Sequence, residues 1–385
     1  MNHRARAAHD YENYAMNDKK KTGVLTFHDY DNYGAILQSY ALQKKLLALG
    51  VDAELIDYSC RYIKNPFRPV NLRKKGFLNY LYGAIGHICY LPRRRRCRRF
   101  RNYMNYSDPV KREELPQLAD KYDILLAGSD QLWDWSLTDF DQTYFLDFAP
   151  EHVKKLSYAV SIGEHLPPEE YRERYAELLG RFDTILMREE YGADFVEALT
   201  GSRPLCACDP TLLLTGEEWS RIAGKPRARG KYILAYQLGI DPKLVAFVKK
   251  LSAETGLPVH YVPFPLVGLM KCRMHIACGP DDWAALIRDA EYVVSDSFHG
   301  IVFAILFHRK FFTTASGHHK NKRVEEFLRQ VGLAERILDR EDRSEDAEPN
   351  PDLQAEIDFS ACDEQIEIMR KMSLERLADA LALKP

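Results

Sequence analysis

One histidine stands where it could exchange a proton with a bound ligand. His299 lies in the segment SDSFHG at 295–300, which follows an apolar run and precedes a helical pattern. A strand that leads into a helix leaves unsatisfied backbone amides at the helix start, and these amides attract anions. Imidazole titrates near neutral pH, so it can donate or accept a proton. The motif predicts either a catalytic His299, with Ser297 and Gly300 beside an anionic ligand, or a histidine that caps a structural turn.

Two arginines could hold that anion. Arg188 follows the apolar run 184–187, and its planar guanidinium can hold a carboxylate or a phosphate through two parallel hydrogen bonds. An ion pair with Glu189 or Glu190 explains the same position equally well. Arg323, at the start of a helical pattern, supports a weaker version of this argument.

A polar loop at 28–35, HDYDNYGA, follows the first expected strand. Gly34 allows backbone amides to approach a ligand closely, and Asn32 can bind a hydroxyl group. His28 ends the same strand. We expect these three residues on the side of a sugar acceptor, with a structural histidine and a ligand-free tight turn as the alternative.

A second polar loop, GSDQLW at 128–133, also follows an apolar run. The Asp130 carboxylate could accept a proton from a hydroxyl, which makes it the second catalytic candidate. Ser129 and Gln131 could bind sugar hydroxyls, and Trp133, with Trp135 close behind, could stack on a sugar face. A helix cap at this loop is the alternative.

Short β-branched or aromatic runs alternate with helical patterns along the chain, which is typical of βαβ units and parallel sheets. The expected strands are 22–28, 53–58, 122–127, 156–160, 184–187, 232–236, 259–262 and 292–294, and helical patterns occupy 34–49, 243–254 and 363–383. Ligands of such sheets bind outside the carboxyl ends of the strands, where the three motifs lie. The sequence therefore predicts an α/β protein with two Rossmann-like domains facing a cleft.

The length of 385 residues also favours two domains. We expect a mobile tail at 1–21, a first Rossmann-like domain at 22–205 with a basic insertion at about 61–105, a second at 206–355, and a C-terminal helix at 356–385 that packs back on the first domain. We expect the acidic stretch at 340–352 to form an exposed loop.

Charge and composition narrow the class of partner. Lys and Arg number 54 against 56 Asp and Glu, which argues against a nucleic-acid binder. The eight cysteines lack zinc-ligand spacing, so we expect free thiols in a cytoplasmic protein and no metal. The apolar segment 77–91 is too short to span a bilayer, although the arginines of 93–99 raise the alternative of peripheral contact with an anionic membrane.

Taken in order, these motifs resemble the polysaccharide pyruvyl transferase family. The matching segments are GVLTFH at 23–28, NYGAILQ at 32–38, GSDQLW at 128–133, YFLDF at 144–148, SYA at 157–159, RE at 188–189, DPTLL at 209–213 and SDSFHG at 295–300. The similarity spans about 23–333, and the ordered set is specific although no single motif is.

The resemblance implies a fold like the two-domain GT-B glycosyltransferases, with the acceptor side on the first domain and the donor side on the second. It also implies phosphoenolpyruvate as donor substrate, with no cofactor. By this resemblance His299 looks like the proton donor and Arg188 like the donor-binding arginine. The loops that contain Asn32 and Ser129 look like acceptor-side elements.

The expected function is therefore transfer of the enolpyruvyl group of phosphoenolpyruvate onto a saccharide as a pyruvate ketal, with release of phosphate, in the biosynthesis of a polysaccharide or cell-surface glycan. A nucleotide-sugar glycosyltransferase and a non-catalytic saccharide-binding protein remain the alternatives. The expected partner is a saccharide acceptor, either polymeric or linked to a lipid.

Overall fold

The computed structural model of the protein describes residues 20–29, 31–60, 77–239, 241–263, 272–314, 322–338, 353 and 355–383, and the side chains of these residues except 77–87. The described residues leave out most of the expected N-terminal tail, the first part of the basic insertion and all of the acidic loop at 340–352.

Four parallel strands form the first sheet in the order β2-β1-β3-β4. They are β1 (Lys21–Leu25), β2 (Asp52–Leu55), β3 (Ile124–Ala127) and β4 (Lys154–Ser157). Two further short strands, β5 (Leu186–Met187) and β6 (Leu205–Cys206), pair in parallel with each other, and isolated bridges from β5 and Thr184 join them to the region of β4. β3 is buried along its whole length, as expected for a central strand that is covered on both faces.

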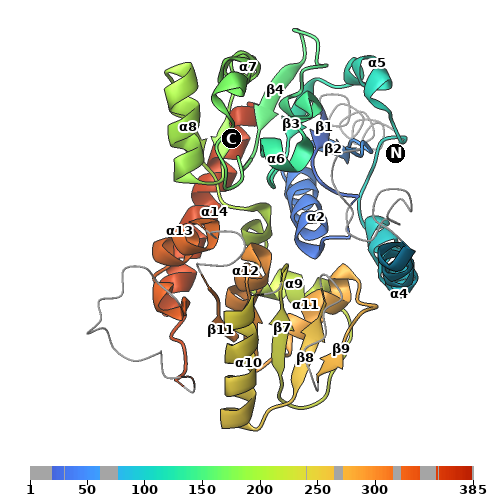
Figure 1. The fold of residues 1–385 in the computed structure, drawn as a ribbon. Helices are drawn as coiled ribbons and strands as arrows, with labels where there is room; N and C mark the ends of the chain where they lie inside the picture. The colour runs from blue at the N-terminus through green and yellow to red at the C-terminus, as the bar shows by residue number, and fades with distance from the viewer. Residues whose placement is uncertain are drawn as a thin grey trace, which may run out of the picture.

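The helices of this half are α2 (Tyr33–Ala48), α4 (Phe77–Arg101), α5 (Leu115–Ala119), α6 (Trp135–Thr138), α7 (Glu169–Leu179) and α8 (Glu190–Thr200), with 3₁₀ turns η1 (Arg112–Glu114), η2 (Gln142–Phe145) and η3 (Pro210–Leu213). The next helix, α9 (Gly216–Ile222), lies in the other half of the molecule (Figure 1). Asn32 begins α2 as its N-cap, because its side-chain oxygen accepts hydrogen bonds from the Gly34 and Ala35 amides. α2 is therefore fixed directly behind the carboxyl end of β1.

Five parallel strands form the second sheet in the order β11-β10-β7-β8-β9. They are β7 (Ile233–Tyr236), β8 (Val259–Val262), β9 (Arg273–Met274), β10 (Tyr292–Ser295) and β11 (Lys310–Phe312). The helices here are α10 (Pro242–Thr255), α11 (Pro280–Arg288), α12 (Phe298–Leu306), α13 (Lys322–Gln330) and α14 (Ser360–Leu381), with the 3₁₀ turn η4 (Ala334–Arg336). The predicted α/β class with two parallel sheets is confirmed.

The two sheets lie in two lobes, and α14 runs from the second lobe back to the first (Figure 1). The carbonyl of Ala380 in α14 accepts a hydrogen bond of 2.7 Å from the Lys154 side chain of β4. Ser373 accepts one of 2.8 Å from the Cys208 amide. The C-terminal helix thus contacts the first lobe directly.

α4 connects the lobes through its arginines. The buried guanidinium of Arg93 lies 4.2 Å from the centre of the Tyr33 ring and donates hydrogen bonds to the carbonyls of Asp31 in the first lobe and Pro263 in the second. Arg96 pairs with Asp282 of α11 at 2.8 Å. Several arginines of the basic run therefore point inward, which weakens the case for membrane contact through this segment.

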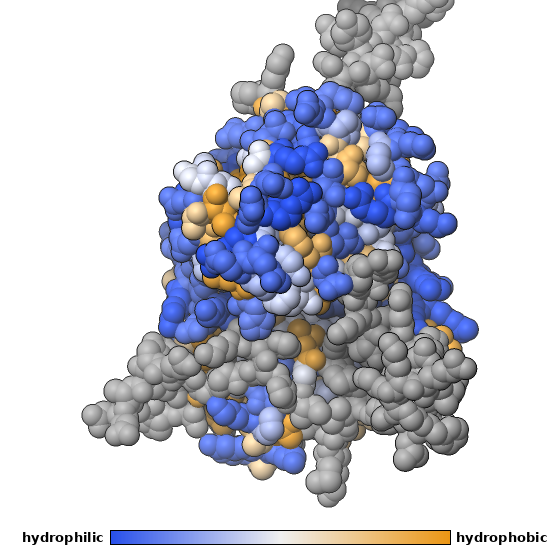
Figure 2. Space-filling model, turned by 45° about the horizontal axis from the view of Figure 1, so that its top comes forward, coloured by the Kyte–Doolittle hydropathy of each residue, from blue (hydrophilic) through white to orange (hydrophobic). Residues whose placement is uncertain are grey.

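The described surface is mainly hydrophilic, with small and separate apolar areas in the view of Figure 2. Among the described residues, no helix has both the length and the apolar character that a membrane crossing requires. None of the eight cysteines forms a disulfide.

Candidate functional site

Loops from both lobes converge at one cluster of polar side chains. Ser129 follows β3, Arg188 follows β5 and Asp209 follows β6 in the first lobe, whereas His299 follows β10 and opens α12 in the second. Gly34 lies in the first turn of α2. The carboxyl ends of parallel strands meet at the same edge of a sheet, which brings distant parts of the sequence together here.

The Asp209 carboxylate is the centre of this cluster. Its Oδ2 atom accepts hydrogen bonds from Arg188 Nη1 at 3.1 Å and from Ser129 Oγ at 3.4 Å. Its Oδ1 atom accepts two more from Thr211, at 2.9 Å from the amide and 2.6 Å from the hydroxyl. The side chain is fully buried, so these contacts fix the carboxylate rigidly.

His299 lies against the same oxygen. Its Nε2 atom is 3.4 Å from Asp209 Oδ2, which is an ion-pair distance but lacks the alignment of a hydrogen bond. The other side of the ring covers Gly34, since a Cβ atom at residue 34 would lie 2.0 Å from His299 Nδ1. A tenth of the His299 side chain remains exposed. The imidazole is thus held between an anion and a glycine, with limited access from solvent.

Arg188 connects the cluster to both lobes. Its Nε donates to Glu189 at 3.0 Å, and its guanidinium lies 5.2 Å from the centre of the Phe298 ring, next to His299. The side chain is only 3 % exposed, and Nη2 has no hydrogen-bond acceptor among the described residues. A buried cation with one unused donor is suited to binding an anion.

The charges of the cluster compensate one another. Burial alone would raise the pKa of Asp209, but the nearby His299 and Arg188 outweigh it and lower that pKa below its usual value. Burial opposes the charge on Arg188, whereas Glu189 and Asp209 raise its pKa above the usual range. With a protonated imidazole, Arg188 and His299 would balance Glu189 and Asp209, which avoids an unpaired buried charge.

Asp130 adjoins the cluster in a rare backbone conformation. Its φ of 85° lies in the left-handed region, which is costly for a residue with a side chain. The carboxylate is close enough to raise the pKa of Arg188, and its Oδ1 accepts a 2.9 Å hydrogen bond from the Gln131 amide. The Gln131 side chain donates to Asp134 at 3.4 Å.

The three loop residues near β1 have different surroundings. Both ring nitrogens of the buried His28 face acceptors, the Thr26 carbonyl at 3.0 Å and Asp57 at 3.1 Å. Asn32 caps α2, and Gly34 underlies His299. Of these three predicted acceptor residues, only Gly34 touches the cluster directly, and His28 instead supports Asp57.

The Trp133 indole packs in the core of the first lobe. Its ring is 1 % exposed and stacks on Phe145 at a centroid distance of 5.3 Å, while its Nε1 donates to the Tyr144 carbonyl. Trp135 lies near Tyr171. Because the flat face of Trp133 is covered by another ring, its surroundings argue against the predicted stacking on a sugar.

The remaining donor-side candidates lie at the starts of α12 and α13. Ser297 is the N-cap of α12 and accepts from the Gly300 amide at 3.3 Å. A Cβ atom at residue 300 would lie 2.5 Å from Ser295 Oγ, so close packing already requires this glycine. Arg323 lies 3.9 Å from Glu164. Burial raises the pKa of the Tyr191 phenol, whereas the charges of Arg323 and Arg188 both act to lower it. The two guanidiniums therefore lie in the same region.

Sequence reasoning missed Asp209 as a member of the site and named Glu189 only as a possible ion-pair partner of Arg188, a pairing that the structure shows. Asp209 belongs to the segment DPTLL at 209–213, where an aspartate before a proline reads as an ordinary turn. Only the pairing of β5 with β6 shows that it stands beside Arg188. Across the part of the chain that the structure describes, no group of three or more His, Cys, Asp or Glu side chains is arranged to hold a metal ion.

Comparison with known proteins agrees with this architecture. A candidate UDP-N-acetylglucosamine 2-epimerase from Listeria monocytogenes has 10 % identity and a TM-score of 0.52, over 95 % of this chain and 98 % of that one. An α-glucosyltransferase in complex with UDP has 10 % identity and a TM-score of 0.46, over 94 % of each chain. At identities this low the likeness concerns the fold alone, and the match to the Listeria monocytogenes protein supports the expected GT-B-like fold.

No curated protein matches the sequence. The family model of the polysaccharide pyruvyl transferases, in contrast, matches residues 32–318, a span that contains Arg188, Asp209 and His299. This match covers well over half of the chain, and it includes loops from both lobes that form the cluster. The chain therefore belongs to the polysaccharide pyruvyl transferase family.

Proposed function

We propose that the protein transfers the enolpyruvyl group of phosphoenolpyruvate to two hydroxyls of a saccharide, forming a pyruvate ketal and releasing phosphate. The observation that carries this proposal is the shared contact at Asp209. Arg188 and His299, one from each lobe, lie 3.1 Å and 3.4 Å from the same carboxylate oxygen. A general acid and an anion-binding group therefore stand together, as the donor requires.

The chemistry begins at the methylene carbon of phosphoenolpyruvate. Protonation of this carbon makes the neighbouring carbon electrophilic, and His299 is the proposed acid. Asp209 places a carboxylate oxygen 3.4 Å from Nε2 and so restrains the ring. Gly34 keeps the ring in one position, which favours proton transfer to a fixed point.

Arg188 is the proposed anchor of the donor. Its Nη2 atom has no acceptor among the described residues and could donate to the carboxylate or phosphate of phosphoenolpyruvate. Arg323, in the same region, is a second candidate for that anion, and the α12 amides near Gly300 are candidates for the leaving phosphate. Both anionic groups of the donor would then have a partner.

The reaction balances with the two substrates alone. One saccharide hydroxyl and then a second add to the central carbon, and the C–O bond to phosphate breaks. The two saccharide hydroxyls release two protons. One returns to His299, which gave its own proton to the methylene carbon, and the other leaves with the phosphate. Asp130 is the proposed acceptor for a hydroxyl proton. Ser129 and the 128–131 loop would face the saccharide.

The test measures phosphate release from phosphoenolpyruvate in the presence of a panel of saccharides. Acceptor-dependent release together with a ketal product, identified by mass spectrometry, is the expected result. Transfer of a glycosyl unit from a nucleotide sugar, without phosphate release from phosphoenolpyruvate, would favour a glycosyltransferase of the same fold instead.

The role of His299 is tested by His299→Ala, with His152→Ala as the matched control because that side chain is 70 % exposed. We expect the first variant to lose turnover by at least about a hundredfold, while it retains its fold and donor binding. Equal rates in both variants would remove His299 from the mechanism. Saccharide binding without any turnover in the wild type would indicate a non-catalytic binding protein.

A further inference from the structure

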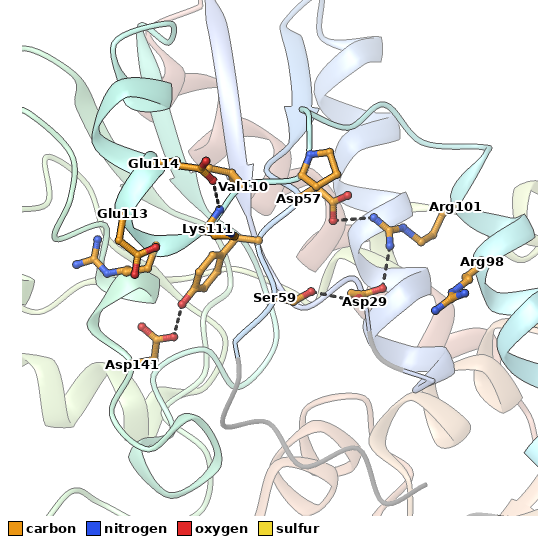
Figure 3. A pocket seen from close by; sticks show the side chains of 13 residues that line it. Asp29, Asp57, Ser59, Arg98, Arg101, Val110, Lys111, Glu113, Glu114 and Asp141 are labelled. Atoms are coloured by element: carbon orange, nitrogen blue, oxygen red, sulfur yellow. Dashed lines mark hydrogen bonds and ion pairs between the residues drawn. The ribbon is translucent and has the colours of Figure 1, made fainter. Parts of the chain in front are cut away.

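A polar pocket of about 970 Å³ lies beside the loop that follows β1, and its lining does not include Arg188 or His299. One wall consists of Asp29, Asp57 and Ser59, behind the carboxyl ends of β1 and β2. α4 contributes Arg98 and Arg101, and the segment 109–114 closes the opposite side (Figure 3). Binding pockets for ligands of drug-like size usually measure roughly 300–1,000 Å³. This pocket is therefore large enough for more than one sugar ring.

Hydrogen bonds fix one wall of this pocket. Arg101 bridges Asp29 and Asp57 with two contacts of 2.8 Å, and Ser59 donates to Asp29 at 2.9 Å. The hydrogen bond from His28 lowers the pKa of Asp57, and the charge of Arg101 lowers it further against the effect of burial. Asp57 thus remains an ionised and oriented acceptor near neutral pH.

The lining favours a neutral ligand that is rich in hydroxyl groups. It contains five carboxylates and four cationic side chains, so it has no strong excess of either charge. An anion would meet several carboxylates, and an apolar molecule would meet few apolar side chains. Fixed carboxylates accept hydrogen bonds from hydroxyls and guanidiniums donate to their oxygens, which is the pattern that a saccharide requires.

The pocket is also near the proposed catalytic cluster. Asp29 of its wall and Gly34, which lies beneath His299 in the first turn of α2, are five residues apart. Even a fully extended chain of that length spans at most about 18 Å between Cα atoms. A saccharide of a few units could therefore occupy the pocket while its end reaches the cluster.

We propose that this pocket binds the saccharide acceptor and selects a neutral oligosaccharide over a monosaccharide. The inference rests on the proposed function for the identity of the reaction, but the binding itself can be tested without turnover. Asp57 and Arg101 form the fixed wall. Arg98, which is exposed and has no ion pair among the described residues, supplies a guanidinium that is available to the ligand.

The test compares Arg98→Ala with Arg99→Ala, its neighbour on α4, which is also exposed but does not line the pocket. Each full-length variant is applied to an array of immobilised neutral mono- to tetrasaccharides of hexoses and N-acetylhexosamines. Binding of phosphoenolpyruvate is measured in parallel by calorimetry. We expect the wild type to retain oligosaccharides better than monosaccharides. Arg98→Ala should bind them about tenfold more weakly, which is the loss of one charge-assisted hydrogen bond.

Arg99→Ala should bind like the wild type, and phosphoenolpyruvate binding should be the same in all three proteins. Equal saccharide binding by both variants, or no saccharide binding by the wild type while phosphoenolpyruvate still binds, would overturn the pocket assignment alone. Saccharide binding that depends on Arg98, in a protein that neither binds phosphoenolpyruvate nor releases phosphate from it, would support the pocket and refute the proposed reaction.

Discussion

His299 covers Gly34 so closely that a β-carbon at residue 34 would lie 2.0 Å from the imidazole Nδ1 atom. The start of α2 in the first lobe therefore packs directly against the imidazole ring of His299 from the second lobe. Because His299 also faces Asp209 through Nε2, its ring is restrained from two sides. The absence of a side chain at residue 34 thus determines where the proposed acid stands.

Gly34→Ala should displace the imidazole and leave most of the fold unchanged. A misplacement of about 1 Å can lower a rate by about a hundredfold, so we expect kcat to fall by that order with a smaller change in phosphoenolpyruvate affinity. Steady-state kinetics with calorimetric donor binding measure both. Gly239→Ala, at a glycine where an added Cβ atom would meet no other atom within 4 Å, is the control for a general effect of losing a glycine. A kcat equal to that of the wild type would show that the ring position is unimportant.

Asp209→Asn should affect both stability and turnover. The change keeps the shape of the side chain but removes the negative charge, which leaves Arg188 and His299 without their shared partner. Removing one member of a buried ion pair typically costs about 3–5 kcal/mol in the free energy of unfolding. Denaturant titration measures this loss, and kinetics of the folded fraction measure turnover. Ser129→Ala removes a 3.4 Å contact to the same oxygen and a 2.9 Å hydrogen bond to the Ala159 carbonyl but no charge, so it should have a smaller effect on both. Equal effects would contradict a role for the charge.

Arg188→Lys should raise KM for phosphoenolpyruvate by at least about tenfold and change KM for the saccharide much less. Lysine cannot bind Glu189, Asp209 and a donor oxygen in the planar arrangement of a guanidinium. Initial rates with each substrate varied in turn separate the two constants. Parallel increases in both constants would indicate that Arg188 acts only through the structure of the site.

Asp296 should make stability depend on pH below neutrality. Burial raises its pKa from 3.8 to about 6, although its Oδ1 accepts a 2.7 Å hydrogen bond from the Leu238 amide. The folded protein thus binds this proton more tightly than the unfolded chain does. The stabilisation is complete below about pH 4 and is lost as pH rises to about 6, with a total of about 3 kcal/mol.

The measurement is the free energy of unfolding of the wild type and of Asp296→Asn at pH values from 4 to 7. The wild type should lose stability relative to this variant across that interval. Asp120→Asn, at a side chain that is 65 % exposed, should follow the wild type instead. Parallel curves for the wild type and Asp296→Asn would contradict the assigned ionisation.

The strands and the fold class could be predicted from sequence because parallel strands are covered on both faces. Such strands read as short apolar runs, and the run at 124–127 is the fully buried β3. The N-cap at Ser297 follows from local hydrogen bonding in the same way. Features of this kind depend on neighbours within a few residues, which the sequence shows directly.

Other features of the site depend on contacts between distant segments. Asp209 is beside Arg188 only because β5 pairs with β6, and it meets His299 only because the lobes approach each other. The direction of the Trp133 indole depends on whether Phe145 or solvent lies next to it. Arg93 shows the same limit, since its membership of a basic run gives no indication that it is buried.

The bonds that Arg93 makes to both lobes have a consequence for how the molecule unfolds. Two-lobed enzymes can melt in separate steps when little holds their halves together. Here a buried cation contacts the carbonyls of Asp31 and Pro263, and α14 ties the C-terminal end of the chain to β4. Loss of either lobe would remove one of the two carbonyls that accept from Arg93. Heating should therefore disrupt both lobes in a single cooperative transition.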